Sequence, residues 1–137
     1  METGFTEFES IKLRSSIDNL VQAEAYVDHV CQSLNINEDN YGNVLIAVTE
    51  AVNNAIKHGN KEDESKEVEI SINDLEDSFQ ILIKDQGNGF DYNQLPDPTA
   101  PENIEKEHGR GVFLMKTLSD DLSFDNNGRC VVITFNK

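Results

Sequence analysis

Residues 108–118, HGRGVFLMKTL, combine a cationic side chain with a pattern that predicts the start of a helix. Gly109 and Gly111 flank Arg110, and an apolar helical segment is expected to open directly after Gly111. Backbone N–H groups at a helix N-terminus attract anions, the helix dipole favours phosphate there, and an arginine adds a charge-assisted donor. The segment therefore indicates either an anion site or a capped helix that follows a flexible loop.

Residues 85–91, DQGNGFD, offer a second place for a ligand contact. They follow an apolar segment, ILIK, that is typical of a buried strand. Asp85 at the end of such a strand can accept a hydrogen bond from a ligand, and Gly87 and Gly89 permit a close approach of the backbone. The alternative is a tight turn in which the aspartate caps its own backbone.

Residues 49–60, TEAVNNAIKHGN, read as the last turns of an amphipathic helix. Glu50 and Asn54 are one turn apart on the polar side, and Lys57 and His58 follow near the end. Glu and Asn at this spacing are common on helices, so this face alone indicates solvated surface as readily as a binding site.

Apolar periodicity and turn signals predict an α+β fold, a two-layer sandwich of a mostly antiparallel mixed sheet with helices on one face. Residues 85–111 hold four of the eight glycines and all three prolines, so a lid is expected at about 91–108. Helix N-caps are expected at Ser15 or Ser16 and at Asn37, and a left-handed cap at Gly59. The expected elements are a strand at 5–15, helices at 17–34 and 38–58, strands at 68–75 and 78–85, a helix after Gly111, and a hairpin at 122–136 that turns at Asn127-Gly128.

Length and composition indicate a single compact domain spanning residues 1–137. The net charge of −15 argues against nucleic-acid binding and favours solubility or a basic protein partner. Cys31 and Cys130 are far apart and form no CxxC motif, so reduced thiols in the cytosol are expected. The sequence shows neither a membrane span nor a signal core, which predicts a cytoplasmic protein with no membrane partner.

Each of the three segments is a weak signal alone, but their order and spacing are specific. E-x-x-x-N-A-x-x-H-G, then D-x-G-x-G-F, then a glycine- and proline-rich segment and G-x-G before a helix resemble the N, G1 and G2 boxes of the GHKL ATP-binding superfamily. The resemblance extends from about residue 8 to 136 and implies the Bergerat fold. In its compact length, the chain resembles the bacterial anti-sigma factor serine-protein kinases of partner-switching systems.

The resemblance assigns roles in ATP and Mg²⁺ binding to residues of all three segments. It implies that Asn54 coordinates Mg²⁺, that Glu50 is the general base, and that Asp85 reads the adenine amino group. Gly87 and Gly89 would let the backbone approach the base and ribose, and Gly109 and Gly111 would hold the phosphates. The remaining candidates for nucleotide contacts are His58, Phe90, Arg110, Val112 and Cys130. Lys57 is a further candidate that the resemblance does not assign, and it is expected either to contact phosphate or to lie at the surface.

Two positions depart from the pattern of the superfamily. Some relatives carry an arginine where this chain has Glu107, and Arg110 inside the G-x-G block is a possible replacement. Relatives often have a threonine on the penultimate strand beside the adenine-binding aspartate, where this chain has Cys130, a weaker donor.

The resemblance implies a serine/threonine kinase that phosphorylates a STAS-domain anti-anti-sigma protein and binds a sigma factor or another effector, as a homodimer. The two departures motivate an alternative, a non-catalytic ATP-gated protein-binding module in such a pathway. A detached histidine-kinase catalytic domain and a nucleotide-free structural domain are further alternatives.

Overall fold

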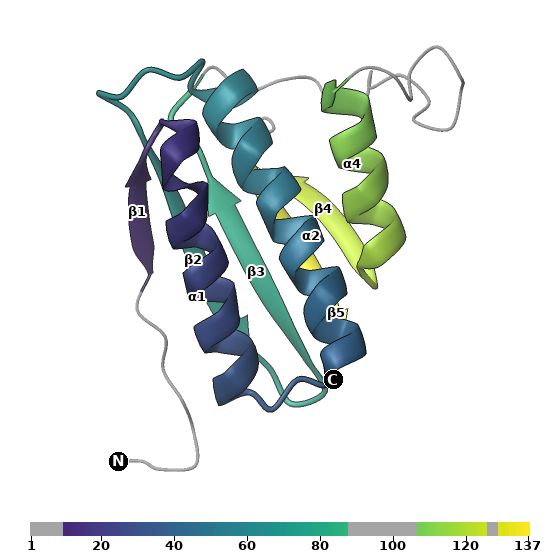
Figure 1. Cartoon of the computed structure of the whole chain (residues 1–137). Coiled ribbons are helices and arrows are strands. Elements are labelled where there is room, and N and C mark those ends of the chain that lie inside the picture. The colour runs from purple at the N-terminus through teal and green to yellow at the C-terminus, as the bar shows by residue number, and fades with distance from the viewer. Residues whose placement is uncertain (1–9, 88–106, 126–128) are drawn as a thin grey trace.

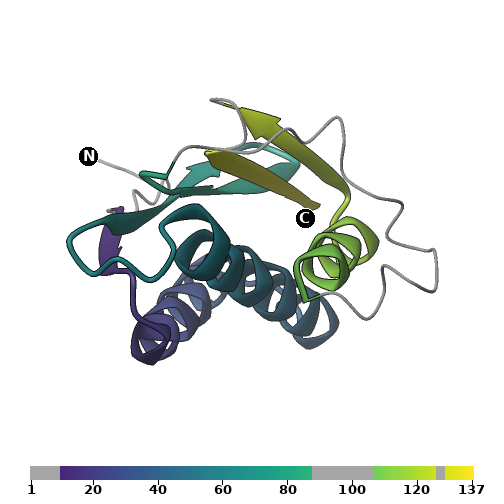
Figure 2. The ribbon, with the colours of Figure 1, turned by 90° about the horizontal axis from the view of Figure 1, so that it is seen from above.

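The computed structural model describes residues 10–87, 107–125 and 129–137, and for 107–110 it describes the backbone only. In this part of the chain, five strands form one sheet in the order β1-β2-β3-β5-β4, with antiparallel pairings throughout. Helices α1, α2 and α4 cover one face of the sheet (Figures 1 and 2), which confirms the predicted α+β sandwich. The elements are β1 (Ile11–Arg14), η1 (Ile17–Asn19), α1 (Leu20–Ser33), α2 (Glu38–Asn54), η2 (Ala55–Gly59), β2 (Glu67–Asp74), β3 (Ser78–Lys84), α4 (Glu107–Leu118), β4 (Asp121–Asp125) and β5 (Cys130–Asn136).

The core lies between the sheet and the helices. Strand β3 alternates buried and partly exposed side chains, and its buried Phe79, Ile81 and Ile83 face the helices. Phe79 stacks on Phe135 of β5 with ring centroids 5.5 Å apart. Burial of each such side chain contributes roughly 1.5–3 kcal/mol, so the sheet and the helix layer depend on one another.

Side-chain caps begin two of the helices as predicted. The Asn37 side chain accepts a hydrogen bond from Asn40 N at 2.9 Å at the start of α2. Ser16 accepts one from Asp18 N at 3.4 Å at the start of η1. Ser15, the other candidate cap, is instead fully buried and donates its hydroxyl to the Lys66 carbonyl.

Several predicted boundaries differ from the structure. The strand expected at 5–15 is β1, Ile11–Arg14, in its described part, and residues 5–9 lie outside the described residues. The helix expected after Gly111 already begins at Glu107. Glycine in a helix costs about 1 kcal/mol relative to alanine, and burial of Val112 and Met115 in the core offsets that cost. The predicted lid and the turn at Asn127-Gly128 lie outside the described residues, except for the helical end of the lid.

The predicted left-handed cap at Gly59 is wrong. The last four residues of the expected helix and Gly59, together Ala55–Gly59, form the wider π-helical turn η2, which Asn60 N closes by donating to Ala55 O at 2.8 Å. Left-handed backbone occurs two residues later, at Lys61 (φ 55°) and Glu62 (φ 58°). A helix cap therefore does not explain the glycine at position 59.

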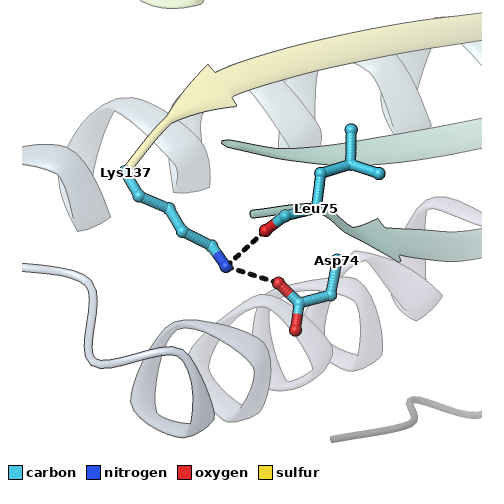
Figure 3. A network of polar contacts seen from close by, with 3 residues as sticks. All are labelled: Asp74, Leu75 and Lys137. Atoms are coloured by element: carbon cyan, nitrogen blue, oxygen red, sulfur yellow. Dashed lines mark hydrogen bonds and ion pairs between the residues drawn. The ribbon is translucent and has the colours of Figure 1, made fainter. Parts of the chain in front are cut away.

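The last residue of the chain fastens β5 to the β2–β3 turn (Figure 3). Lys137 Nζ lies 2.6 Å from Asp74 Oδ1 and donates to Leu75 O at 2.7 Å, and Lys137 N donates to Asp77 O at 2.9 Å. This contact lies at the lower end of the molecule in Figure 1. None of the described helices has the length and apolar character that a membrane crossing requires.

Lys137→Met should lower the free energy of unfolding by about 0.5–1 kcal/mol, because it keeps the apolar stem and removes a half-exposed ion pair. Urea unfolding measures the change, and the loss should shrink in high salt. Lys116→Met, at an exposed position on α4, is the matched control. Equal effects of the two variants would contradict the role of the contact.

Candidate functional site

The three segments singled out in the sequence meet at one end of the molecule. Helix α2 and strand β3 end there, and α4 begins there, at the upper end in Figure 1. Antiparallel packing of α4 beside α2 brings residues of the last turns of α2 next to the first turns of α4. The segments at 49–60, 85–87 and 107–111 are therefore neighbours in space.

Two glycines allow the end of α2 to touch the turn that follows β3. A Cβ atom on Gly59 would stand 2.5 Å from the Asp85 carboxylate, and one on Gly87 would stand 1.9 Å from the Gly59 carbonyl oxygen. The contact at Gly87 excludes a side chain there, since a backbone carbonyl cannot move aside, whereas a side chain at Gly59 would displace the Asp85 carboxylate. The close approach of Asp85, rather than a helix cap, therefore accounts for the glycine at position 59.

The turn after β3 is held by its own backbone N–H groups. Asp85 N donates to Arg129 O at 2.8 Å, Gln86 N donates to Asn60 Oδ1 at 2.7 Å, and Gly87 N donates to Asp85 Oδ1 at 2.8 Å. The last of these is the Asx-type contact expected as the alternative for this segment. Here the capping bond fixes one carboxylate oxygen and leaves the other for a further contact, so the two interpretations are compatible.

Burial raises the pKa of the Asp85 carboxyl above its usual value. The Gly87 N–H bond and the charges of Arg129 and Lys66 act in the opposite direction but do not cancel this effect. A half-buried carboxylate whose second oxygen has no hydrogen-bond partner among the described residues is a strong acceptor for a ligand N–H group.

Cys130 lies beside Asp85 at the start of β5. It is buried, and it pairs with Lys84, the residue before Asp85, across the β3–β5 ladder. Burial raises the pKa of its thiol, and the carboxylates of Asp125 and Asp85 add to the shift. The group is therefore a neutral, weakly donating S–H next to the aspartate. Both cysteines are free thiols, as predicted.

Helix α4 covers the polar face of α2 that the sequence left open to two interpretations. A Cβ on Gly111 would stand 3.0 Å from Asn54 Nδ2 and 3.2 Å from Glu50 Oε1. The absence of a side chain at Gly111 lets α4 rest directly on this pair. Glu50 and Asn54 are each only partly exposed, so they do not form an ordinary solvated surface.

The Asn54 amide carries an unmet hydrogen-bonding demand. Its Nδ2 is buried and has no partner among the described residues. A buried donor without an acceptor costs about 1–3 kcal/mol, so such a group calls for an explanation. An anionic oxygen of a ligand placed between α2 and α4 would supply the missing acceptor.

The described residues do not offer a divalent cation at Asn54 a complete set of ligands. The described residues contain no group of three or more His, Cys, Asp or Glu side chains that could hold a metal. Mg²⁺ commonly binds through one or two protein oxygens, with phosphates and water completing its shell. An amide one turn from Glu50 fits that pattern of binding.

The early start of α4 changes the expected roles of its glycines. Only the first few N–H groups of a helix lack an intrahelical acceptor. Gly109 is the third residue of α4 and falls within this turn, whereas Gly111 is the fifth and follows it. The N–H of Gly109 is therefore placed to bind an anion, and Gly111 acts through its contact with Glu50 and Asn54.

The other predicted contact residues have mixed positions. Lys57 is half-buried and His58 is exposed, both in η2 at the site end of α2. Val112 is buried at 5% exposure, so its side chain belongs to the core rather than to a ligand. Arg110 lies in the first turn of α4, in the part whose side chains are not described. Gly89 and Phe90 lie outside the described residues.

Asn60, which the sequence pattern does not single out, is buried at 1% exposure directly behind the site. It bonds to the turn after β3, to Ser15 and to the Glu67 carbonyl. Its only sequence signal is an asparagine after the H-G pair, which reads equally well as a turn residue.

Gly59→Ala should lower the free energy of unfolding by about 1–3 kcal/mol, because the added methyl displaces Asp85. The matched control is Gly42→Ala in α2, where a Cβ meets nothing within 4 Å. That change should raise stability by about 0.5–1 kcal/mol, as alanine is favoured in helices. Chemical denaturation measures both, and a neutral Gly59→Ala would contradict the close contact.

Asp85→Asn should leave the melting temperature at pH 7 unchanged or raise it. A carboxyl with a raised pKa in the folded state destabilises that state when ionised, so stability falls as pH rises from the unfolded to the folded pKa. Asparagine removes this penalty, and the gap between variant and parent should close as pH is lowered through that window. Calorimetry at several pH values measures the difference in melting temperature between the two proteins. A difference that widens as pH is lowered would contradict the raised pKa of Asp85.

Known proteins share this sequence pattern and fold. Residues 13–135 match the family described as the histidine kinase-like ATPase domain. The serine-protein kinase RsbW of Oceanobacillus iheyensis is 29% identical over 126 residues, covering 88% of this chain and 80% of the relative. RsbW of Bacillus subtilis is 33% identical over 100 residues, covering 69% of this chain and 62% of the relative.

A solved structure agrees with these matches at the level of fold. The histidine kinase domain of the blue-light activated histidine kinase of Erythrobacter litoralis superposes with a TM-score of 0.50 at 15% identity, over 90% of this chain and 60% of that one. The matched range and the three sequence blocks show that the chain belongs to the histidine kinase-like ATPase domain family of the GHKL superfamily, and that within it the chain resembles the anti-sigma factor kinases.

Proposed function

We propose that this chain is an ATP- and Mg²⁺-dependent serine/threonine protein kinase that acts as an anti-sigma-type regulator. Its substrate would be a serine of a STAS-domain anti-anti-sigma protein. The observation that carries the proposal is the pairing of Glu50 with the unsatisfied amide of Asn54 beneath Gly111. The RsbW relatives, which are named serine-protein kinases, support the reaction class.

Asp85 reads the base in this proposal. One carboxylate oxygen is occupied by Gly87 N–H, and the other accepts a hydrogen bond from the adenine amino group. The bare backbone at Gly59 and Gly87 leaves no Cβ atoms beside the carboxylate. The neutral thiol of Cys130 supports the aspartate from the neighbouring strand as a weak donor.

Asn54 and the first turn of α4 bind the phosphates. The NH₂ group of Asn54 would donate to a phosphate oxygen, which supplies the acceptor that its buried Nδ2 lacks, and its Oδ1 would be the protein ligand for Mg²⁺. The N–H of Gly109 lies at the positive end of the helix dipole. When bound, Mg²⁺ neutralises phosphate charge that would otherwise repel the attacking group.

Glu50 acts as the general base. The serine oxygen of the substrate forms a bond to the γ-phosphorus while the bond from that phosphorus to the oxygen of ADP breaks, and Glu50 accepts the hydroxyl proton. Its position one turn before Asn54 keeps the base next to the phosphate-binding groups. Products are ADP and a phosphoserine on the partner.

Phosphorylation then changes which partner is bound. The product carries almost two additional negative charges, and this chain has a net charge of −15. Repulsion and the cost of burying the phosphate release the phosphorylated partner and free the surface for a sigma factor or another effector. Two copies of the chain would form a homodimer, by analogy with the related kinases.

Glu50→Gln should lower phosphate transfer from radiolabelled ATP to the cognate STAS protein by about 100-fold or more, because the amide accepts no proton. ATP affinity measured by calorimetry should be nearly unchanged. Glu24→Gln, at an exposed position on α1, is the matched control. Transfer at the parental rate by Glu50→Gln would rule out the base assignment.

A second candidate is an ATP-gated protein-binding module without catalysis. Glu107 is the first residue of α4, and an acidic residue there weakens the attraction of that helix end for phosphate. ATP would then select a partner without transferring its phosphate. Unchanged mass of the STAS protein after long incubation, together with an ATP-dependent complex, would favour this candidate over the kinase.

A further inference from the structure

Asn60 is a buried polar hub directly after η2. Its Nδ2 donates to Ser15 Oγ at 2.8 Å and to Glu67 O at 3.0 Å, and its Oδ1 accepts from Gln86 N at 2.7 Å. Both ends of the amide are therefore satisfied at 1% exposure. Neither a carboxylate nor a hydroxyl reproduces two donated bonds and one accepted bond from one position, so the site requires an amide.

The hub joins four segments that are separate in sequence. Ser15 follows β1, Glu67 begins β2, Gln86 follows β3, and Asn60 itself follows η2. Ser15 closes the arrangement by donating its hydroxyl to Lys66 O at 2.8 Å, and Gln86 Oε1 accepts from Glu67 N at 2.7 Å. Networks of this kind fix one arrangement of the backbone when every member is satisfied.

The bond from Gln86 N to Asn60 has a distinct place in the turn after β3. Asp85 N is bound by the carbonyl of Arg129, the residue before β5, and Gly87 N by the Asp85 carboxylate itself. Of the three successive N–H groups, Gln86 N alone is bound by a side chain from another segment. Asn60 also follows Gly59, so one short segment both packs against Asp85 and accepts the hydrogen bond from Gln86 N, the next residue after Asp85.

We propose that Asn60 is a positioning residue that sets the preference of the site for adenine over guanine by holding the turn that carries Asp85. This inference rests on the proposed function, in which Asp85 accepts a hydrogen bond from the adenine amino group. Guanine presents a carbonyl oxygen at that place, which repels a carboxylate. The full difference in affinity between the two nucleotides is expected only if the carboxylate cannot turn or shift away, because discrimination of this kind depends on a fixed, buried partner.

The test is the ratio of ATP to GTP affinity, measured by calorimetry on the whole chain with Mg²⁺. Asn60→Ala should weaken ATP binding and reduce the ATP-over-GTP ratio by about tenfold, the loss of one well-placed hydrogen bond. Ser15→Ala is the matched control, because it disturbs the same hub and leaves the bond from Gln86 N to Asn60 in place. It should lower the melting temperature and keep the parental ratio, which separates positioning from mere stability.

A second pair of variants keeps the Asn60 side chain and its bonds to Ser15 and Glu67. Gln86→Pro removes the N–H that Asn60 accepts, and Gln86→Ala keeps it, while both lose the side-chain contact with Glu67 N. The proline variant should lose the preference as Asn60→Ala does, and the alanine variant should keep it. This pair decides the matter even if Asn60→Ala fails to fold.

The outcomes separate this inference from the proposed function. A parent protein that binds ATP with preference, while Asn60→Ala and Gln86→Pro keep the parental ratio, overturns the positioning role and leaves the proposed function standing. A parent that binds neither nucleotide, or both equally, overturns the adenine-binding role of Asp85 and the inference with it. A fall in the ATP-over-GTP ratio that is confined to Asn60→Ala and Gln86→Pro supports the inference.

Discussion

The close contact of two bare backbone segments, at Gly59 and Gly87, is the constraint on which the candidate site depends. It joins the end of the helix layer to the end of the sheet and places the Asp85 carboxylate within 2.5 Å of where a Gly59 side chain would begin. The wide turn η2 brings the chain to this point, and the left-handed residues that follow lead it away toward β2. A side chain at Gly87 would push the two backbone segments apart, and one at Gly59 would displace the Asp85 carboxylate.

The two ends of the molecule differ in how their polar groups are satisfied. At the end with Lys137, polar groups meet one another within the chain, through an ion pair and hydrogen bonds (Figure 3). At the other end, the structure retains a half-buried Asp85 with a raised pKa and a buried Asn54 amide without a described partner. Groups that cost stability in the protein alone are typical of sites where a ligand completes the hydrogen bonds.

The sequence predicted most of the fold because its elements obey local rules. Alternation in β2 and β3, the periodic stripe of α2 and the Asn37 cap each depend on residues close together in the chain. The start of α4 was missed because packing on α2 outweighs the local preference of Gly109 and Gly111 against a helix. Gly59 was assigned to a cap because the sequence contains no sign of Asp85 approaching from 26 residues away. Asn60 was missed for the same reason, since its partners come from three other segments.

The central claim is that the end of α2, the turn after β3 and the start of α4 form one ATP site. Backbone amide chemical shifts recorded during titration with ATP and Mg²⁺ test it most directly, because each segment reports separately. The account predicts that the largest changes gather at residues 54–60, 85–87 and 107–112, while the amides of Asp74, Leu75 and Lys137 at the opposite end stay unchanged. Saturable changes centred on that opposite end, or none at millimolar ATP, would contradict it.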